Sequence, residues 1–327
     1  MNNRFWKNKR VLITGFEGFL GSHLTRAMLQ SGAKVIGLDI KTFRKETILC
    51  PREYKKMVVY KGSVTNHNLL KKILRKHSIK VIFHLAAEAI VNRSQKNPRK
   101  AFESNITGTW EVLETARKQG NMQAIVVASS DKAYGAHKNL PYHEDAPLVA
   151  NHPYDVSKSC ADLITNTYFH TYGLPVTITR CGNIYGPGDF NFSRLIPDAL
   201  RCLSIGKTLQ VRSDGKFVRD YVYVDDIVEG YLRIAELLEK KRLCGESFNL
   251  SNECPLTVIE LLQKINNLNL RESKLSYRIL EEAKYEIKKQ YLSSSKAKRI
   301  LGWKPAYSLC DGLRKTAEWY FSYFSRR

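Results

Sequence analysis

The stretch RVLITGFEGFLG, residues 10–21, decides the fold, because a short apolar run ends at a glycine and two more glycines follow at intervals of three. The run predicts a buried strand, and the apolar spacing that begins at Leu20 predicts a helix that ends before Gly32. Glycines at such a turn allow a tight bend, a close approach of the backbone to a pyrophosphate, and close packing of the helix on the strand. The stretch therefore predicts a strand, a turn and a helix whose N-terminus faces phosphate groups.

The alternation of strands and helices continues beyond this stretch. Further strands are predicted at residues 34–39, 56–60, 80–85, 124–129, 175–180 and 247–251, with a helix at 68–77. Such alternation predicts the α/β class, with a Rossmann-type doubly wound parallel sheet. From Asn183 onward turn residues and irregular segments replace the repeat, which indicates a smaller C-terminal α/β domain for the substrate. We expect residues 1–182 plus 222–252 to form the first domain, and residues 183–221 plus 253–327 the second.

Composition excludes several classes of protein. The 327 residues are 43% hydrophobic and 26% charged, a balance typical of globular domains and not of collagen-like, disordered or coiled-coil chains. The apolar stretch at residues 81–91 is interrupted by His84 and Glu88 and is too short to span a membrane. Seven scattered cysteines without a CxxC pair indicate neither a disulfide framework nor a zinc site. We therefore expect a cytoplasmic protein that holds no metal and is not bound to a membrane.

Asp39 closes the second predicted strand, about 20 residues beyond the glycine turn. A carboxylate there can accept hydrogen bonds from both hydroxyls of an adenosine ribose and would repel a 2′-phosphate. The position therefore predicts NAD as the cofactor in preference to NADP.

Tyr154 and Lys158 form a Y-x-x-x-K pair on a predicted helix that ends at Tyr172, so their side chains lie one turn apart on the same face. The pair follows a strand whose end carries the residues SSDK, 129–132. A neighbouring lysine and a nicotinamide cation would both lower the tyrosine pKa. Tyr154 is therefore predicted to act as an acid or base near neutral pH.

Several motifs occur in order along the chain. They are TGFEGFLG (14–21), HLAAEA (84–89), NITGT (105–109), SSDKAYG (129–135), YDVSK (154–158), RCGNIYGPGD (180–189), RDYVYVDD (219–226) and LGWKP (301–305). In this order and at these separations they resemble the extended short-chain dehydrogenase/reductase family, in particular the NAD-dependent epimerases and dehydratases of nucleotide sugars. The motifs are most similar to those of sugar-nucleotide 4,6-dehydratases, and SSDK with PYDVSK and RCGNIYG most resembles CDP-glucose 4,6-dehydratase.

The resemblance implies a reaction and a role for each matched residue. NAD takes the hydride from C4 of the sugar and returns it to C6, so the cofactor ends unchanged. Tyr154 takes the proton of the C4 hydroxyl, Ser130 hydrogen-bonds that oxygen, and Lys158 holds the nicotinamide ribose. Lys132 removes the C5 proton, and Asp131 protonates the departing C6 hydroxyl. The implied product is a 4-keto-6-deoxy sugar nucleotide.

The resemblance also implies which residues hold the two ligands. Cofactor contacts are expected from Gly15, Phe16, Glu17, Gly18, Phe19, Leu20, Gly21, Asp39, Ser63, Val64, Leu85, Ala86, Ala87, Asn105, Tyr154 and Lys158. Contacts with the nucleotide-diphosphate sugar are expected from Glu88, Asn183, Arg194 and Arg219, and arginine suits a diphosphate because its planar fork binds two oxygens. Ser63 stands where relatives usually place an aspartate against the adenine. Lys132 stands where most relatives place a glutamate and the CDP-glucose enzymes a lysine.

Two other functions stay open at this point. A 4-epimerase or 4-ketoreductase of the same family shares the glycine turn, Tyr154 and Lys158. Epimerisation at C4 needs neither a C5 base nor an acid for C6, so Asp131 and Lys132 favour elimination.

The second alternative is a non-catalytic, basic protein that binds nucleic acid. The net charge of 53 − 31 = +22 favours polyanions or phosphate-bearing substrates, and basic clusters occur at residues 71–76 and 240–242. Both clusters lie on predicted helices, whose solvated faces often carry such runs, and no nucleic-acid-binding motif accompanies them. We therefore do not expect nucleic acid as a partner. Because relatives pair through the helices that correspond to residues 109–118 and 154–172, we expect a homodimer with a four-helix interface.

Overall fold

A seven-stranded parallel sheet forms the centre of the computed structural model, which describes residues 3–238, 243–272, 274–283 and 286–325. The strand order is β11-β6-β5-β4-β1-β2-β3, and every neighbouring pair is parallel. The strands are β1 (Arg10–Thr14), β2 (Lys34–Asp39), β3 (Val58–Lys61), β4 (Val81–His84), β5 (Ala124–Ala128), β6 (Val176–Cys181) and β11 (Ser247–Leu250). The chain reverses its direction of travel across the sheet between β1 and β4, and sheets of this kind bind ligands beyond the carboxyl ends of the strands at that point.

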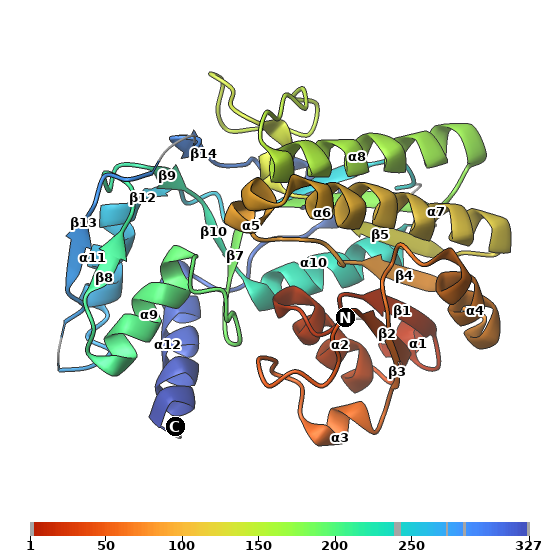
Figure 1. Cartoon of the computed structure of the whole chain (residues 1–327), viewed down its shortest axis with the longest axis horizontal. Helices are drawn as coiled ribbons and strands as arrows, with labels where there is room; N and C mark the ends of the chain where they lie inside the picture. The colour runs from red at the N-terminus through yellow and green to blue at the C-terminus, as the bar shows by residue number, and fades with distance from the viewer. Residues whose placement is uncertain (1–2, 239–242, 273, 284–285, 326–327) are drawn as a thin grey trace.

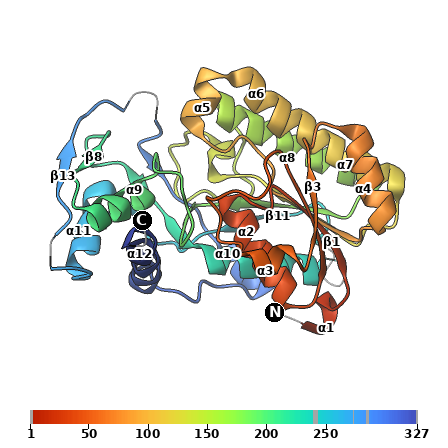
Figure 2. The same cartoon turned by 60° about the horizontal axis from the view of Figure 1, so that its bottom comes forward.

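Helices cover both faces of this sheet, as Figures 1 and 2 show. One face carries α2 (Phe19–Gln30) and α10 (Val224–Leu237), and the other carries α4 (His67–His77), α7 (Gly108–Gln119) and α8 (Pro153–Tyr172). Shorter turns connect them: α1 (Asn3–Trp6), α3 (Pro51–Tyr54), α5 (Val91–Lys96), α6 (Pro98–Phe102), the π-helix η1 (Glu103–Thr107) and the 3-10 helix η2 (Asp131–Tyr134). The doubly wound α/β fold predicted from the sequence is thereby confirmed. The ends of the predicted strands differ from those in the structure by two residues at most.

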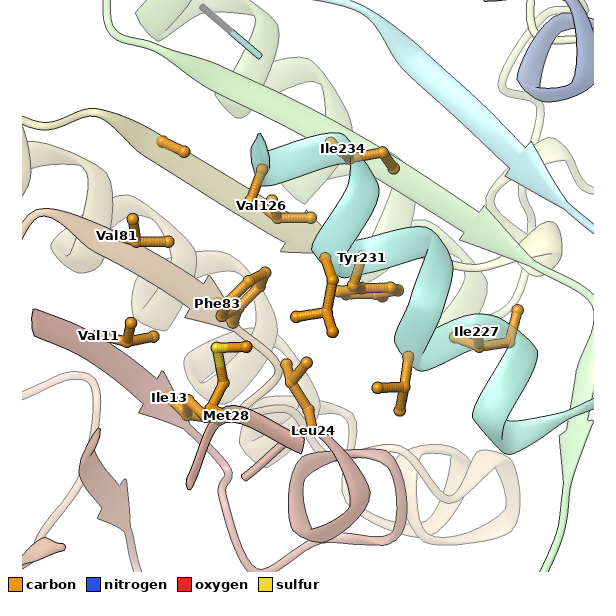
Figure 3. Close-up of a cluster of buried hydrophobic side chains, with 14 of the residues drawn as sticks. Val11, Ile13, Leu24, Met28, Val81, Phe83, Val126, Ile227, Tyr231 and Ile234 are labelled. Carbon is orange, nitrogen blue, oxygen red and sulfur yellow. The ribbon is translucent and has the colours of Figure 1, made fainter. Parts of the chain in front are cut away.

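Alternation along the strands supplies the two apolar layers. Val11 and Ile13 of β1 enter the layer under α2 and α10, whereas Leu12 enters the layer under α4 and α7. Figure 3 shows the first layer, in which Leu24 and Met28 of α2 and Tyr231 of α10 lie around Phe83 of β4. Ile227 and Ile234 of α10 belong to the same layer. Each fully buried side chain of this kind stabilises the fold by about 1.5–3 kcal/mol. This packing holds the carboxyl ends of β1, β4 and β5 in fixed positions.

A second apolar core lies to one side of the sheet (Figure 1). It is built by α9 (Leu195–Ile205), α11 (Val258–Asn267) and α12 (Leu309–Ser325) with the strands β7 (Asn183–Tyr185), β8 (Leu209–Val211), β9 (Val218–Arg219), β10 (Tyr221–Tyr223), β12 (Leu256–Thr257), β13 (Tyr277–Ile279) and β14 (Lys289–Gln290). This part is more regular than the sequence predicted, because strands of two or three residues are too short to show alternation. The predicted domain boundaries stay a prediction.

Residues 297–303, which follow the strands of the second core, pack back against the central sheet. The π-helix η3 (Ala297–Leu301) and Trp303 pack in the layer under α2 and α10, and Trp303 Nε1 donates to the carbonyl of Asp226 at 3.0 Å. The two cores are therefore connected by packing as well as by the chain.

Of the two predicted basic clusters, the one at residues 71–76 lies on α4. Its lysines and Arg75 are exposed, whereas Ile73 and Leu74 between them are buried in the sheet layer. The cluster at 240–242 lies outside the described residues. No described helix combines the length and apolar character that crossing a membrane requires.

Candidate active site

The glycine turn joins β1 to α2 at the carboxyl edge of the sheet. Gly15 has φ of +71°, and a Cβ there would lie 2.9 Å from the backbone N and Cα of Ala86. A Cβ at Gly21 would lie 2.0 Å from the carbonyl oxygen of Gly15, so this position accepts no side chain. Gly18 is the N-cap of α2, and no side chain caps the helix. The first N–H groups of α2 are thus available to an anion such as a pyrophosphate.

Glu17 holds the loop that follows β2. Its buried carboxylate accepts hydrogen bonds from the N–H groups of Phe43 (2.6 Å) and Arg44 (2.8 Å) and from the Tyr54 hydroxyl (2.7 Å). This loop turns the Arg44 guanidinium onto the carboxylate of Asp39, at 2.5 Å. Burial raises the pKa of Asp39, and Arg44 opposes this shift. The predicted ribose carboxylate therefore has a cationic neighbour that the sequence did not indicate.

A cavity of about 520 Å³ opens beside this ion pair. Its lining carries the four cationic side chains of Lys41, Arg44, Lys61 and Arg93, the acidic Glu46 and the neutral Thr42. Among the other predicted cofactor residues, Ser63 shares a hydrogen bond with the Thr65 hydroxyl (2.8 Å), and Val64 is buried against α7. The apolar residues of the turn lie at the start of α2, where Phe16 is buried and Phe19 and Leu20 are half-buried.

The end of β4 is held by neutral hydrogen bonds. His84 Nδ1 lies 2.8 Å from Thr14 Oγ1, and His84 Nε2 lies 3.1 Å from Thr109 Oγ1. Burial lowers the pKa of His84 to about 3, so the ring is uncharged at neutral pH. The N–H groups of Leu85 and Ala86 donate to Thr14 Oγ1. These contacts place the residues after β4 beside the glycine turn.

Asn105 connects the segment after β4 to α8. Its side chain accepts from the N–H of Glu88 (2.7 Å) and donates to the Glu88 carbonyl (3.2 Å) and to Ser157 Oγ (2.8 Å). Ala87 and Glu88 are half-buried along this segment. Asn105 therefore fixes the backbone at Glu88 relative to the start of α8.

Tyr154 and Lys158 project from the first turns of α8, as predicted. Lys158 Nζ donates to the carbonyl of Ala128 at the end of β5 (2.8 Å), and burial lowers the pKa of Lys158 to about 8. Burial raises the pKa of Tyr154, and the Ser130 hydroxyl opposes this shift most strongly. Without the cofactor, Lys158 does not lower the Tyr154 pKa, because its amine is turned toward β5. The lowering expected when the nicotinamide cation is also present stays a prediction.

Ser130, Asp131 and Lys132 form the start of η2, directly after β5. The Ser130 hydroxyl accepts from the Lys132 N–H (3.2 Å) and donates to Asp131 Oδ1 (3.0 Å). Burial raises the pKa of Asp131; burial and then the charge of Arg219 lower the pKa of Lys132. Within the described part of the chain, no group hydrogen-bonds Lys132 Nζ. A buried carboxyl group with a raised pKa thus neighbours an amine with a lowered pKa, which suits acid–base chemistry.

The predicted substrate residues approach from the second core. Arg219 of β9 donates to the carbonyls of Val218 (2.8 Å) and Lys288 (3.3 Å), and its charge acts on both Asp131 and Lys132. Arg194 pairs with the buried Asp189 (2.7 Å) and is close enough to Tyr154 to oppose its pKa shift. Asn183 donates to the Asp220 carbonyl (3.2 Å). The structure therefore brings Arg219 toward Asp131 and Lys132, and Arg194 toward Tyr154.

Three residues of this region escaped the sequence analysis. Asp155 follows Tyr154 and is buried, and burial, opposed first by Lys132, raises its pKa to about 6. Gln290 donates to the carbonyl of Asp131 (2.8 Å), and Asp220 is buried with a pKa raised by burial to about 7. A carboxylate inside the Tyr-Lys motif was a visible signal for Asp155. Gln290 carries no local signal, because its contact spans 159 residues.

Comparison with known proteins places this site in a family. The family model for GDP-mannose 4,6 dehydratase matches residues 12–316. The chain belongs to this family of NAD-dependent sugar-nucleotide epimerases and dehydratases. It is 32% identical to UDP-glucuronate 4-epimerase of Thermodesulfobacterium geofontis, with 94% of this chain and 95% of that protein covered. It is 30% identical to dTDP-glucose 4,6-dehydratase of Xanthomonas campestris pv. campestris, with 95% and 93% covered.

Solved structures of the family agree with this assignment. The dTDP-glucose 4,6-dehydratase of Streptomyces venezuelae, solved with NAD bound, has a TM-score of 0.85 to this chain at 31% identity, and 97% of this chain and 98% of that one are covered. The family therefore establishes an NAD-dependent enzyme of sugar nucleotides, and its members divide between epimerases and dehydratases.

The residues of this chain fit NAD. The turn at Gly15 and Gly21 leaves a cradle that a Cβ would fill, the uncapped start of α2 suits the pyrophosphate, and Asp39 ends β2 where the adenosine ribose binds. The confirmed cofactor is thus the one predicted from the sequence.

Proposed function

We propose that the protein is a sugar-nucleotide 4,6-dehydratase, which converts a nucleotide-diphosphate hexose to its 4-keto-6-deoxy form. The observation that supports this choice is the Asp131–Lys132 pair beside Tyr154. Asp131 is buried with a raised pKa and Lys132 has a lowered one, so one can supply a proton while the other accepts one. A 4-epimerase needs neither group.

The chain's residues divide the proton transfers among them. NAD, held by the glycine turn and Asp39, would supply the hydride acceptor for C4 and the hydride donor for C6. Tyr154, with Ser130 hydrogen-bonding the same oxygen, removes the proton of the C4 hydroxyl. The resulting ketone acidifies C5, whose proton passes to Lys132 while Asp131 protonates the leaving C6 hydroxyl. Burial raises the pKa of Asp131, which favours the protonated form that this step needs.

The remaining predicted residues bind and orient the ligands. Lys158 lies one turn from Tyr154, where it holds the nicotinamide ribose. Arg194 and Arg219 bind the diphosphate, because Arg194 carries fixed positive charge near Tyr154 and Arg219 carries it near Asp131 and Lys132. Asn183 contacts the sugar. CDP-glucose is the first substrate to test, since Lys132 and the surrounding motifs resemble the CDP-glucose enzymes.

Turnover in deuterated water tests this function. Purified protein is incubated with CDP-, dTDP-, UDP- and GDP-glucose, and the products are followed by NMR while absorbance reports reduced cofactor. We expect a 4-keto-6-deoxy product with deuterium at C5 and no steady accumulation of NADH. Lys132→Ala should still oxidise C4 but stall before elimination, trapping reduced cofactor.

Two results would favour other reactions. A C4 epimer with no exchange at C5 would identify an epimerase, and stoichiometric NADH would identify a net oxidoreductase. Elimination by Lys132→Ala at the normal rate would leave Lys132 as a charge that binds substrate.

We also propose a homodimer that pairs α7 and α8 with the same helices of a second copy. The two helices pack side by side (Figure 1), and Trp110 of α7 and Leu163 of α8 are 52% and 59% exposed. Exposed large apolar residues on neighbouring helices are typical of interfaces. Sedimentation should show a dimer that Leu163→Glu converts to a monomer, whereas Ile205→Glu on α9, also exposed, should leave it unchanged. A dimer in both variants would contradict this interface.

A further inference from the structure

Asp155 carries an unpaired buried oxygen next to the tyrosine of the site. It is 4% exposed, and its Oδ1 atom is buried without a hydrogen-bond partner among the described residues. The N-cap of α8 is His152, and no side-chain cap occurs there, so Asp155 does not serve as the cap of the helix. Asp131, by contrast, accepts a hydrogen bond from Ser130. A buried carboxylate that lacks partners destabilises the fold unless a charge compensates it.

Lys132 lies across the contact between α8 and η2, and its charged form, reached when the amine takes a proton, favours the Asp155 anion. The charged and titratable groups that face this contact are Asp131 and Lys132 of η2, His152 and Asp155 of α8, Arg219 of β9 and Glu286 before β14. Lys132 opposes the raised pKa of Asp155 more strongly than His152 does. Asp131 and Asp155 in turn oppose the lowering of the Lys132 pKa by burial and by Arg219.

The backbone around the two side chains is held in place. Ser159 Oγ donates to the carbonyl of Ala133 (2.8 Å), which ties α8 to η2, and Gln290 donates to the carbonyl of Asp131 (2.8 Å). Neither Lys132 Nζ nor Asp155 Oδ1 has a hydrogen-bond partner within the described ranges. The four-carbon stem of lysine lets the amine move between a substrate and a neighbouring carboxylate.

We propose that Asp155 is the positioning residue of Lys132, whose carboxylate receives the Lys132 ammonium after the amine has taken the C5 proton. This inference rests on the proposed dehydratase function. The C5–H bond breaks, its electron pair forms the C5–C6 double bond, and the C6–O bond breaks as Asp131 protonates the oxygen to give water. Asp155 gains no proton. The ammonium exchanges its protons with solvent and returns one to C5 when hydride reaches C6, which restores the neutral amine.

The pH dependence of elimination tests this role, because a carboxylate that only supports the fold would not change it. Lys132 must be unprotonated to act, so its pKa sets the acidic limb of the kcat profile. Asp155→Asn removes an anion that raises the Lys132 pKa, and the limb should therefore move to lower pH by about one unit. Asp155→Glu restores the charge and should restore the limb.

Further measurements with CDP-glucose and dTDP-glucose as probes separate positioning from binding. Asp155→Asn should lower kcat about tenfold or more while KM stays near that of the wild type, and reduced cofactor should accumulate because C4 oxidation is unaffected. Asp145→Asn removes the same charge from an exposed position before α8 and should change neither quantity. If Asp155→Asn does not fold, Asp155→Ser, which is smaller and also uncharged, is measured in its place.

The outcomes distinguish this inference from the function on which it rests. A wild type that makes no 4-keto-6-deoxy product from any sugar nucleotide would overturn the proposed function itself. A wild type that eliminates water, with an Asp155→Asn limb at the wild-type pH, would overturn the role of Asp155 alone. A limb that moves equally in Asp155→Glu would also overturn it, because the charge would then be irrelevant.

Discussion

Two halves of the site meet at Tyr154 and differ in how their polar groups are paired. The cofactor half comprises the glycine turn, Glu17, Asp39 and His84; the elimination half comprises residues 130–132 with Asp155. In the cofactor half, Glu17 accepts three hydrogen bonds and the uncharged His84 makes two. In the elimination half, Lys132 Nζ and Asp155 Oδ1 lack partners in the part of the chain that the structure describes.

The difference reflects what each half does. A binding surface gains from groups that are already oriented, since little freedom is then lost when the ligand binds. Proton transfer needs groups whose charge can change, and full pairing within the chain would hold each group in one state. The relatives include both epimerases and dehydratases, and under the dehydratase function that we propose the two reactions would differ in the elimination half.

Tyr154→Phe should give the largest effect, because it removes the hydroxyl that both halves serve. We expect activity to fall about 10²- to 10⁴-fold, while the fold and cofactor retention persist. Turnover of CDP-glucose measures the first, and NAD released from denatured protein measures the second. Near-normal activity would show that the reacting centre lies elsewhere.

Gly21→Ala should break the cofactor half alone. The new Cβ would lie 2.0 Å from the Gly15 carbonyl oxygen, so the turn must distort. We expect the free energy of unfolding to fall by about 3 kcal/mol and the bound NAD to be lost. Chemical denaturation and cofactor content measure these effects. Gly120→Ala is the control for backbone strain without a collision, because Gly120 has φ of +67° and a Cβ there meets no atom within 4 Å, whereas Gly21 lies in α2 and has no positive φ. Full NAD content in Gly21→Ala would contradict the cradle.

Lys158→Met should stabilise the NAD-free protein at pH 7 while abolishing activity. The pKa of Lys158 falls from 10.5 to about 8 on folding, so stability from this group is present above pH 10.5 and is lost as pH falls through 8. Removing the charge recovers up to about 3 kcal/mol below pH 8, offset by about 1 kcal/mol for the hydrogen bond to Ala128. Denaturation at pH 7 and pH 10 measures the gain, which should shrink at the higher pH. An equal difference at both values would mean that the ammonium is not the cause.

Substitution of the basic face of α4 should give the smallest effect. Lys71→Ser combined with Lys72→Ser removes two exposed charges, and we expect less than about 0.5 kcal/mol per site in stability and unchanged dehydratase activity. Turnover and denaturation measure both, and nucleic-acid binding at physiological salt should be equally weak before and after. Tight binding that these substitutions remove would support a nucleic-acid partner.

Much of the cofactor half was predictable because its signals are local. A glycine every three residues, an acid at the end of the next strand and a Tyr-Lys pair one turn apart each report on backbone geometry within a few residues. The strands of the second core were missed, since β9, β12 and β14 have two residues each. In the chain by itself burial raises the Tyr154 pKa, and neither this burial nor the turn of Lys158 toward Ala128 is a local property of the sequence; the lowering of that pKa with the cofactor bound stays a prediction.

The sequence by itself determined the parallel sheet, the glycine turn, the cofactor and the candidate acids and bases, because periodicity and motif spacing encode neighbours along the chain. Only the tertiary structure decided how those groups are charged and held. It brought Arg219 to Lys132, Gln290 to Asp131 and Arg44 to Asp39, and it left Asp155 Oδ1 buried without a hydrogen-bond partner among the described residues. The pKa values depend on burial and on distances between segments that are remote in the sequence, and neither can be inferred from the local sequence.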